Sequence, residues 1–286
     1  MSGNGRSMSP TPIRPVLKWV GGKSRSLPHS LGEFPEKIAT YFEPFIGGAA
    51  VFFALATAKR FKRAVLSDRN SALIDVYTAL KTDADAVIGV LHKYQYEQGE
   101  YYRIRALDPD KLDLPERAAR VIYLNKTGYN GLYRVNSRGE FNVPFGRYKN
   151  PNFCDQETLR AAARALKDVE LYVDDFEATC VGAKRGDAVY FDPPYHPVSK
   201  TANFTAYHKV DFGEDEHRRL KKVFAKLARR GVAVVLSNSD TQFTRDVFSD
   251  FPTKKIAVTR PINSKASGRG VVYELLVTNA VASPRE

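Results

Sequence analysis

Cysteine is scarce in this chain. Cys154 and Cys180 are the two cysteines among 286 residues, and there is no CxxC pair that would suggest a zinc site. Two isolated thiols also provide no disulfide framework, so the sequence fits a reducing compartment, and we expect a cytoplasmic protein. We interpret both thiols as ordinary half-buried side chains.

Long hydrophobic runs are missing as well. No apolar stretch approaches the roughly 18 residues of a membrane span, and the polar residues 1–14 lack the apolar core of a signal peptide. We therefore expect no membrane contact, and we interpret residues 1–14 as a loose arm. Hydrophobic residues still make up 43% of the chain, enough for a buried core in one large domain or two modest ones.

Acidic residues are outnumbered by basic ones. Lysine and arginine total 44 against 32 aspartates and glutamates, which gives a net charge of +12 and a pI near 9.6. This excess favours a polyanionic partner, with nucleic acid as the first choice. A basic proteome that uses charge for solubility would show the same excess, so charge alone leaves both interpretations open.

Several short apolar runs end in polar or acidic side chains, which is the pattern of buried parallel strands. Such runs cover residues 64–68, 188–192 and 232–238, and two further strands are expected at residues 256–259 and 273–278. Helical patterns lie between them, at residues 49–59, 71–81 and 214–230. This alternation predicts an α/β fold with a mostly parallel sheet, whose ligands bind beyond the carboxyl ends of the strands. Asp68, Asp192 and Asn238 stand at such ends.

The character of the chain changes between the second strand–helix unit and the strand at residues 188–192. Strand signals fade, charged and aromatic residues dominate, and four prolines interrupt the pattern, namely Pro109, Pro115, Pro144 and Pro151. We predict an inserted second domain over residues 83–165. The catalytic domain would then be assembled from residues 15–82 and 166–286.

A glycine motif, Glu43-Pro44-Phe45-Ile46-Gly47-Gly48-Ala49, joins an apolar stretch to a helix. Glycine at such a turn lets the backbone approach a nucleotide-like ligand closely. Asp68 follows about twenty residues later at the next strand end, a spacing typical of a carboxylate that binds ribose hydroxyls. A glycine helix entry with a surface aspartate is an equally simple interpretation.

The motif Asp192-Pro193-Pro194-Tyr195 directly follows an apolar strand. Consecutive prolines stiffen the backbone and remove two N–H donors, so the Asp192 carboxylate and a neighbouring carbonyl are left as acceptors. Tyr195 adds a flat aromatic face. Two acceptors and a ring suit a planar amine, and the strand context favours this interpretation over a plain proline-rich loop.

Two basic segments complete the pattern. In Lys18-Trp19-Val20-Gly21-Gly22-Lys23 a cation stands beside the single tryptophan, a combination that can hold an anion and stack a base, without the spacing of a P-loop. Residues 117–149 combine seven lysines or arginines with one acid, Glu140, and six interleaved aromatics. Within them, residues 136–139 look like a turn between two short strands. A basic, aromatic hairpin fits a nucleic-acid groove better than it fits a solvated face.

In this order the motifs resemble those of the Dam-type family of DNA adenine methyltransferases. Besides the lysine–tryptophan, glycine and Asp-Pro-Pro-Tyr motifs, the likeness includes residues 129–134, 138–148 and 201–208, and it extends over nearly all of residues 15–278. The long match over the hairpin is more specific than Asp-Pro-Pro-Tyr, which recurs in other amino-methyltransferases. One departure is Ala49, which stands where the family has a second glycine.

The resemblance implies a Rossmann-like methyltransferase domain with an inserted helical and β-hairpin domain that recognises the DNA target. It also implies S-adenosylmethionine as methyl donor, S-adenosylhomocysteine as product, no metal, and a monomer acting on double-stranded DNA at GATC. The residues that it assigns to the cofactor are Trp19, Lys23, Phe45, Gly47, Asp68, Asp175, Phe176 and Asp192. Those that it assigns to DNA are Lys18, Tyr129, Asn130, Leu132, Arg134, Pro144, Arg147 and Tyr148. Catalysis falls to Asp192, Pro193, Pro194 and Tyr195.

The predicted reaction makes two demands on the protein. The exocyclic nitrogen of adenine is a poor nucleophile, so we expect Asp192 and the Pro193 carbonyl to accept its hydrogens and localise its lone pair, in line with the methyl group. A duplex hides this amine, so the base must be flipped out, with Tyr129 filling the gap and Tyr195 stacking on the base.

Other functions stay open on the sequence alone. Methyltransferases of RNA adenines or of the N4 amine of cytosine share the motif, although the cytosine enzymes more often carry serine at the position of Asp192. Protein glutamine methyltransferases carry asparagine there and lack the basic hairpin. A catalytically silent DNA-binding protein with the same fold is disfavoured by the intact Asp-Pro-Pro-Tyr.

Overall fold

The computed structural model describes residues 12–19, 23, 26–198, 212–259 and 271–279. Within these residues seven strands form one sheet in the order β3-β2-β1-β4-β5-β7-β6. The strands are β1 Ile38–Glu43, β2 Phe61–Asp68, β3 Val169–Val173, β4 Ala188–Phe191, β5 Ala233–Ser239, β6 Thr253–Thr259 and β7 Val271–Thr278. Strands β1 to β5 pair in parallel, and β7 runs antiparallel between β5 and β6. The predicted α/β fold with a mostly parallel sheet is confirmed.

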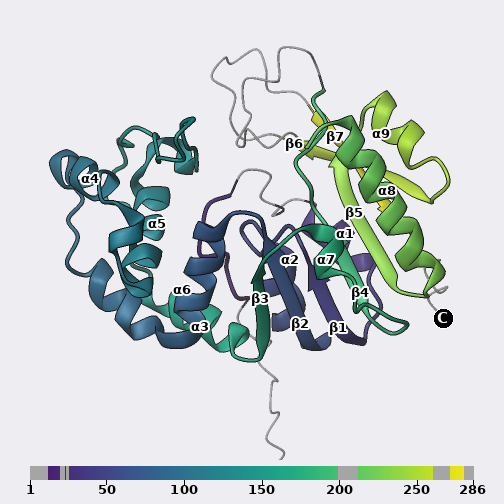
Figure 1. Ribbon diagram of the computed structural model, residues 1–286, viewed down its shortest axis with the longest axis horizontal. Coiled ribbons are helices and arrows are strands. Elements are labelled where there is room, and N and C mark those ends of the chain that lie inside the picture. Colours follow the sequence, from purple (N-terminus) through teal and green to yellow (C-terminus); the bar gives the residue numbers. More distant parts are fainter. Residues whose placement is uncertain (1–11, 20–22, 24–25, 199–211, 260–270, 280–286) are drawn as a thin grey trace, which may run out of the picture.

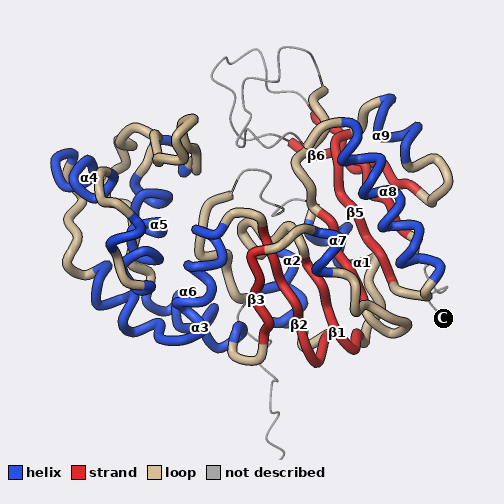
Figure 2. The backbone as a smooth tube through the Cα atoms, in the orientation of Figure 1, coloured by secondary structure: helices blue, strands red, loops and turns tan. Residues whose placement is uncertain are grey.

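Helices pack on the sheet and beyond one of its edges. They are α1 Leu27–Gly32, α2 Ala50–Thr57, α3 Ser71–Leu91, α4 Gln98–Arg105, α5 Leu114–Thr127, α6 Gln156–Leu166, α7 Phe176–Thr179, α8 Glu214–Arg229 and α9 Gln242–Val247. Figure 1 shows α3 to α6 gathered on the β3 side of the sheet and α8 and α9 at the opposite end. The strands form one continuous layer between the two groups (Figure 2).

The order of the strands reverses between β1 and β4. From β1 the chain proceeds outward through β2 and β3, then returns to the other side of β1 as β4 and proceeds outward again through β5. At such a switch point the loops after the two central strands leave in opposite directions and open a crevice at their carboxyl ends. Asp68 is the last residue of β2, and Asp192 and the glycine turn follow β4 and β1, so the fold brings them to this edge.

The predicted amphipathic helix at residues 214–230 is present as α8. Leu220, Val223, Phe224 and Leu227 are all buried, as the helical spacing requires. Gly231 follows with φ of 74°, the left-handed conformation that ends many helices.

The predicted helix at residues 71–81 continues to Leu91 as α3. At Asp83 the backbone leaves the helical region, with φ of −156° and ψ of 88°. The Asp83 carboxylate accepts the Ala86 N–H at 2.9 Å, which is how an N-cap starts a helix. A new helical segment therefore begins where the change of sequence character placed a domain boundary.

The predicted hairpin in the basic segment is partly correct. The turn at residues 136–139 forms, with the Gly139 N–H donating to the Asn136 carbonyl at 3.0 Å. The two short strands do not form, and isolated bridges at Val135–Phe141 and Gly128–Phe145 take their place. Two backbone bonds flank the turn, from the Asn136 N–H to the Glu140 carbonyl and from the Asn142 N–H to the Arg134 carbonyl, both at 2.9 Å, and Pro144 has no N–H to extend this ladder.

We expect Phe224→Ala to destabilise the protein strongly. Phe224 is fully buried, and its ring centroid lies 4.5 Å from that of Phe251 and 6.1 Å from that of Phe248. Replacing such a ring by alanine costs about 3–5 kcal/mol of unfolding free energy, which denaturant titration measures. Lys222→Ala, at an exposed position of the same helix, is the matched control with a change within about 0.5 kcal/mol. Equal losses in the two variants would contradict this packing.

Candidate active site and nucleic-acid interface

The glycine turn after β1 is shaped around the Trp19 ring. Gly47 has a φ of +43°, and a Cβ added there would lie 2.7 Å from Trp19 Cδ1. The Tyr77 hydroxyl donates to the Gly47 carbonyl at 2.7 Å, which fixes the turn from the α3 side. Both the dihedral angle and the ring therefore require glycine at this position.

Ala49 occupies the position where the resembled family has its second glycine. Its φ is 57°, so alanine adopts the left-handed conformation that glycine adopts freely. The turn is nevertheless closed, because the Ala49 N–H donates to the Ile46 carbonyl at 2.6 Å. The left-handed region costs an alanine roughly 1–2 kcal/mol, so this departure leaves local strain at the start of α2.

Asp68 is oriented by backbone donors at the end of β2. Its Oδ1 accepts the Asn70 N–H at 2.9 Å, and its Oδ2 accepts the Gly47 N–H at 3.3 Å. The Asn70 side chain in turn caps α3 by accepting the Ala72 N–H. The carboxylate is thereby held beside the glycine turn, in the place predicted for a group that binds ribose hydroxyls.

Lys23 joins the Asp-Pro-Pro-Tyr motif to the lysine–tryptophan segment. Its Nζ lies 2.7 Å from Asp192 Oδ1 and donates to the Tyr195 hydroxyl at 2.7 Å. The same ammonium stands 4.5 Å from the centroid of the Tyr195 ring. Lys23 is only 3% exposed, so this pairing compensates for the burial of its charge.

Burial raises the pKa of two acids at this site, Asp192 and Glu43. It raises the pKa of Asp192 to about 6, although the charge of Lys23 and its hydrogen bond pull the value down. Burial likewise raises the pKa of Glu43 to about 8. Near neutral pH, Asp192 is therefore mostly ionised and Glu43 mostly protonated.

Glu43 is a site residue that the sequence analysis did not single out. It opens the glycine motif, and its Oε2 accepts the Tyr41 hydroxyl at 2.8 Å and the Phe52 N–H at 3.1 Å. Both Asp192 and Lys23 act electrostatically on it, and it ends β1, the strand that pairs with β4 just before the catalytic motif. An acid that directly follows a buried run is the signal that could have identified it.

Asp175 and Phe176 lie together but in different surroundings. One oxygen of Asp175 lies 2.6 Å from both Arg69 and Arg219, and the other caps α7 by accepting the Glu177 N–H. Phe176 is buried and stacks on Phe45 with ring centroids 5.5 Å apart. The Asp175 carboxylate is thus engaged in ion pairs, and the two rings form an apolar wall.

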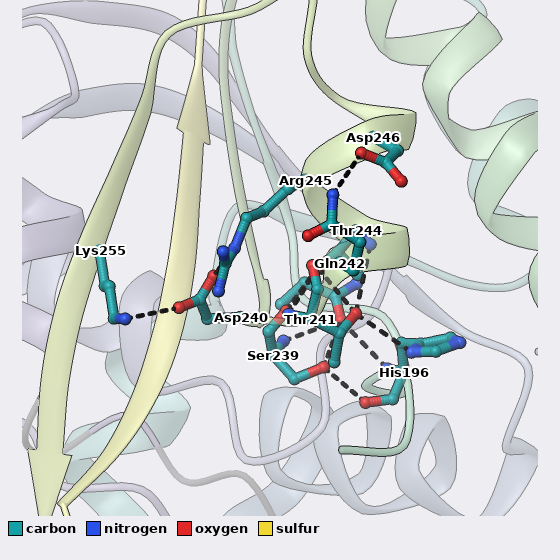
Figure 3. A network of polar contacts seen from close by, with 10 residues as sticks. His196, Ser239, Asp240, Thr241, Gln242, Thr244, Arg245, Asp246 and Lys255 are labelled. Carbon is teal, nitrogen blue, oxygen red and sulfur yellow. Dashed lines mark hydrogen bonds and ion pairs between the residues drawn. The ribbon is translucent and has the colours of Figure 1, made fainter. Parts of the chain in front are cut away.

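The backbone after Asp-Pro-Pro-Tyr is anchored to the end of β5. The His196 N–H donates to Asn238 Oδ1 at 3.1 Å, and the Ser239 hydroxyl donates to the His196 carbonyl. Figure 3 shows this contact beside the start of α9, where Thr241 caps the helix and Asp240 pairs with basic groups. Asn238, predicted at a strand end, therefore fixes the loop that carries the catalytic motif.

Several predicted DNA-reading residues line one cavity of about 260 Å³. Its lining consists of Tyr129, Asn130, Phe145, Gly146, Arg147 and Tyr148. Tyr129 is 52% exposed, which is unusual for a ring of its size. Leu132 is half-buried, while Pro144 and Arg134 are exposed on the same loop. The structure therefore brings Tyr129, Asn130, Arg147 and Tyr148 together at one surface, whereas Leu132, Arg134 and Pro144 lie on the same loop outside that lining.

Lys18 reaches this surface from the start of the chain. Its ammonium lies 4.5 Å from the centroid of the Tyr148 ring. A Cβ added to Gly131 would lie 2.5 Å from Lys18 Cδ, so the lysine stem packs directly on the loop. The fold thus unites two segments that the sequence analysis had assigned to DNA separately.

Some expectations lie outside the described residues or concern features absent from them. The family-like stretch 201–208 and residues 20–22 of the lysine–tryptophan motif are not described. Cys154 is half-buried and Cys180 is buried, and both are free thiols. Across the described ranges there is no cluster of three potential metal ligands from His, Cys, Asp and Glu. The helices described there include none with the length and apolar character of a membrane span.

Glu43→Gln is expected to flatten the pH dependence of stability. The folded protein keeps a proton on Glu43 up to about pH 8, whereas the unfolded chain releases it near pH 4.5. Between these values the folded state binds more protons, so the free energy of unfolding of the wild type falls as pH rises. Glutamine does not ionise, so the variant should avoid a loss on the order of 2 kcal/mol between about pH 6 and pH 8.

Thermal and denaturant unfolding across this pH range measure the effect. Glu157→Gln, which removes an exposed carboxylate on α6, is the matched control and should follow the wild type. A Glu43→Gln curve parallel to that of the wild type would show that Glu43 is not protonated in the folded state.

Comparison with known proteins agrees with this geometry. Residues 19–262 match the model of the family described as D12 class N6 adenine-specific DNA methyltransferase. The Type II methyltransferase M1.LlaDCHI of Lactococcus lactis subsp. cremoris is 43% identical over 275 residues, which cover 93% of this chain and 95% of that protein. The Type II methyltransferase M.MjaIII of Methanocaldococcus jannaschii is 41% identical, over 93% of this chain and 99% of its own.

The DNA adenine methylase of Escherichia coli strain K12 is 37% identical over 267 residues, with 92% of this chain and 94% of that protein covered. These matches confirm the resemblance inferred from the motifs. They leave aside the roles of single residues, which rest on the geometry above. The chain belongs to the D12 class N6 adenine-specific DNA methyltransferases and is an adenine-specific DNA methyltransferase.

Proposed function

We propose that this enzyme transfers a methyl group from S-adenosylmethionine to N6 of an adenine that is flipped out of duplex DNA, within the sequence GATC. The observation that carries the proposal is the position of Asp192. Its carboxylate follows β4 at the switch point of the sheet, next to Lys23 and in front of two prolines and a tyrosine. An acceptor, a stiff backbone and an aromatic face are what an exocyclic amine requires.

The residues at the glycine turn fit S-adenosylmethionine. Gly47 leaves room where a side chain would collide with Trp19, and Asp68 is held beside it with its oxygens set by backbone donors. In this proposal Asp68 binds the ribose hydroxyls, Lys23 binds the carboxylate, and Trp19 closes the pocket. Phe45 and Phe176 form the apolar wall for the adenine ring. Since the Asp175 carboxylate is occupied by ion pairs, its contact would come from the main chain at Asp175 and Phe176.

The sulfonium of the bound cofactor supplies an activated methyl group, so the side chains have to position the amine. Asp192 and the Pro193 carbonyl accept hydrogen bonds from its two N–H groups and localise the nitrogen lone pair toward the methyl group, and the nitrogen loses one of these protons after the transfer. Pro194 keeps the loop rigid, and Tyr195 stacks on the purine. Lys23 pairs with Asp192 in this structure, so it must exchange that contact for an anionic group as the amine arrives.

We further propose that residues 83–165 form the target-recognition domain, with residues 15–82 and 166–286 as the catalytic domain. The DNA contacts would come from Lys18, Tyr129, Asn130, Leu132, Arg134, Pro144, Arg147 and Tyr148. Tyr129, 52% exposed, fills the gap left by the flipped base and offsets part of the few kcal/mol that flipping costs. Arg134 presents its guanidinium to guanine O6 and N7, the commonest specific contact in the major groove. The enzyme acts as a monomer in this scheme.

Digestion of a treated plasmid tests the proposed target directly. Plasmid incubated with the enzyme and S-adenosylmethionine should become resistant to a nuclease blocked by methylated GATC and sensitive to one that requires it. Methyl incorporation without either change would retain the methyltransferase and reject GATC as its site.

Asp192→Ala should nearly abolish methyl transfer. Removing the acceptor leaves the amine lone pair delocalised, and losses of about 10²–10³-fold or more in kcat are typical for a lost electrostatic contact of this kind. Tritiated methyl transfer to a duplex measures turnover, and mobility shift measures DNA binding, which should change little. Asp250→Ala, at an exposed position, is the control with wild-type turnover. Near-normal turnover in Asp192→Ala would rule out the mechanism.

Arg134→Ala should relax the choice of sequence more than it weakens the cofactor site. Loss of a bidentate contact to guanine reduces discrimination by roughly 1–3 kcal/mol at that base pair. Rates on a GATC duplex and on duplexes changed at one position give the discrimination ratio. Arg229→Ala, on the exposed face of α8, removes the same charge at a distance from the loop. Unchanged ratios in Arg134→Ala would contradict the assignment.

A further inference from the structure

Asn125 is a fully buried amide near the end of α5, and it holds two segments that are far apart in sequence. Its Oδ1 accepts the Lys18 N–H at 2.8 Å. Its Nδ2 donates to the Lys18 carbonyl at 2.8 Å and to the Gly131 carbonyl at 3.0 Å. The Asn125 side chain thus bonds to both the N–H and the carbonyl of Lys18, as a backbone partner would. It also bonds to the loop that follows α5.

The segment held in this way runs from the DNA-reading surface to the cofactor pocket. Lys18 packs on Gly131 and Tyr148 of the loop that follows α5, which we call the reading loop. The next residue, Trp19, lies against Gly47 of the glycine turn, and its ring centroid is 5.3 Å from that of Tyr133. Further along, Lys23 pairs with Asp192. Three functional groups therefore share one short stretch of backbone.

We propose that Asn125 is a positioning residue that couples target reading to the cofactor pocket, a role that rests on the proposed function. The geometry gives the reason. A shift of the reading loop on DNA moves the Gly131 carbonyl, and Asn125 transmits that shift to both backbone groups of Lys18. Trp19 follows because it is the next residue of the chain, and its ring lies against the glycine turn of the cofactor pocket. Two sites coupled in this way change each other's affinity by the same factor.

The coupling factor between DNA and S-adenosylhomocysteine is the quantity to measure. The dissociation constant of S-adenosylhomocysteine is determined by calorimetry with and without a saturating GATC duplex. The ratio of the two dissociation constants is the coupling ratio. Couplings of this kind commonly fall at about 5- to 150-fold, and we expect the wild type to reach at least about fivefold. Asn125→Ala should bring the ratio within about twofold, because the shared clamp is gone.

Asn279 offers a matched control in the same chain. Its Oδ1 accepts the Val234 N–H at 2.7 Å, and its Nδ2 donates to the Val232 carbonyl at 2.8 Å. Asn279→Ala therefore removes a similar side-chain bracket around the start of β5, away from the reading loop. This variant should keep the coupling ratio of the wild type, whatever it loses in thermal stability.

If Asn125→Ala does not fold, Gly131→Ala tests the same clamp from the other side. The added Cβ would lie 2.5 Å from Lys18 Cδ and push the lysine off the loop, and it should lower the coupling in the same way. A folded variant of either kind with the wild-type ratio, or a wild type with no coupling, overturns the proposal.

Methyl transfer measured in parallel separates this inference from the function on which it rests. If the wild type methylates GATC and Asn125→Ala keeps the wild-type coupling ratio, only the clamp is rejected. A wild type that methylates no duplex rejects both the function and the clamp.

Discussion

The Lys23 ammonium is the point at which the separate parts of this structure meet. It is almost fully buried and lies 2.7 Å from both the Asp192 carboxylate and the Tyr195 hydroxyl. Burial of a charge without partners costs much free energy, so Lys23 is stable in this position only when the loop after β4 packs against it. The adjacency of β1 and β4 at the reversal of strand order makes this possible.

Around that contact several residues adopt conformations or environments that are unfavourable in free energy. Ala49 is held in the left-handed region, and the pKa values of the buried Glu43 and the partly buried Asp192 are raised by loss of solvent. Strain and shifted acids of this kind concentrate at functional sites, where the surrounding structure enforces them. The core supplies that enforcement through the hydroxyls of Tyr41 and Tyr77, which bond to the glycine motif.

The basic surface and the methyl-transfer site are built on different parts of the fold. The loop after α5 belongs to the helical group beside β3, whereas Asp192 follows a central strand. Lys18 contacts the loop and Lys23 contacts Asp192, so these two residues connect recognition with chemistry in the proposed mechanism. Val16 and Leu17, which directly precede Lys18, are buried in the core. This part of the chain therefore has a structural role as well as the proposed functional one.

The sequence by itself determined the strand–helix alternation, the central strands and the polar groups at their ends, because buried parallel strands are continuous apolar runs. It did not predict β1, which was recognised only as an apolar stretch before the glycine motif, or β3, an edge strand whose Tyr172 and Val173 are exposed, or the loss of the hairpin strands. Only the tertiary structure decided that Lys23 contacts Tyr195 across 172 residues, that Glu43 is buried behind Asp192, and that Asn125 holds Lys18. Those contacts depend on the order of strands in the sheet, and periodicity within a segment contains no information about which segment becomes its neighbour.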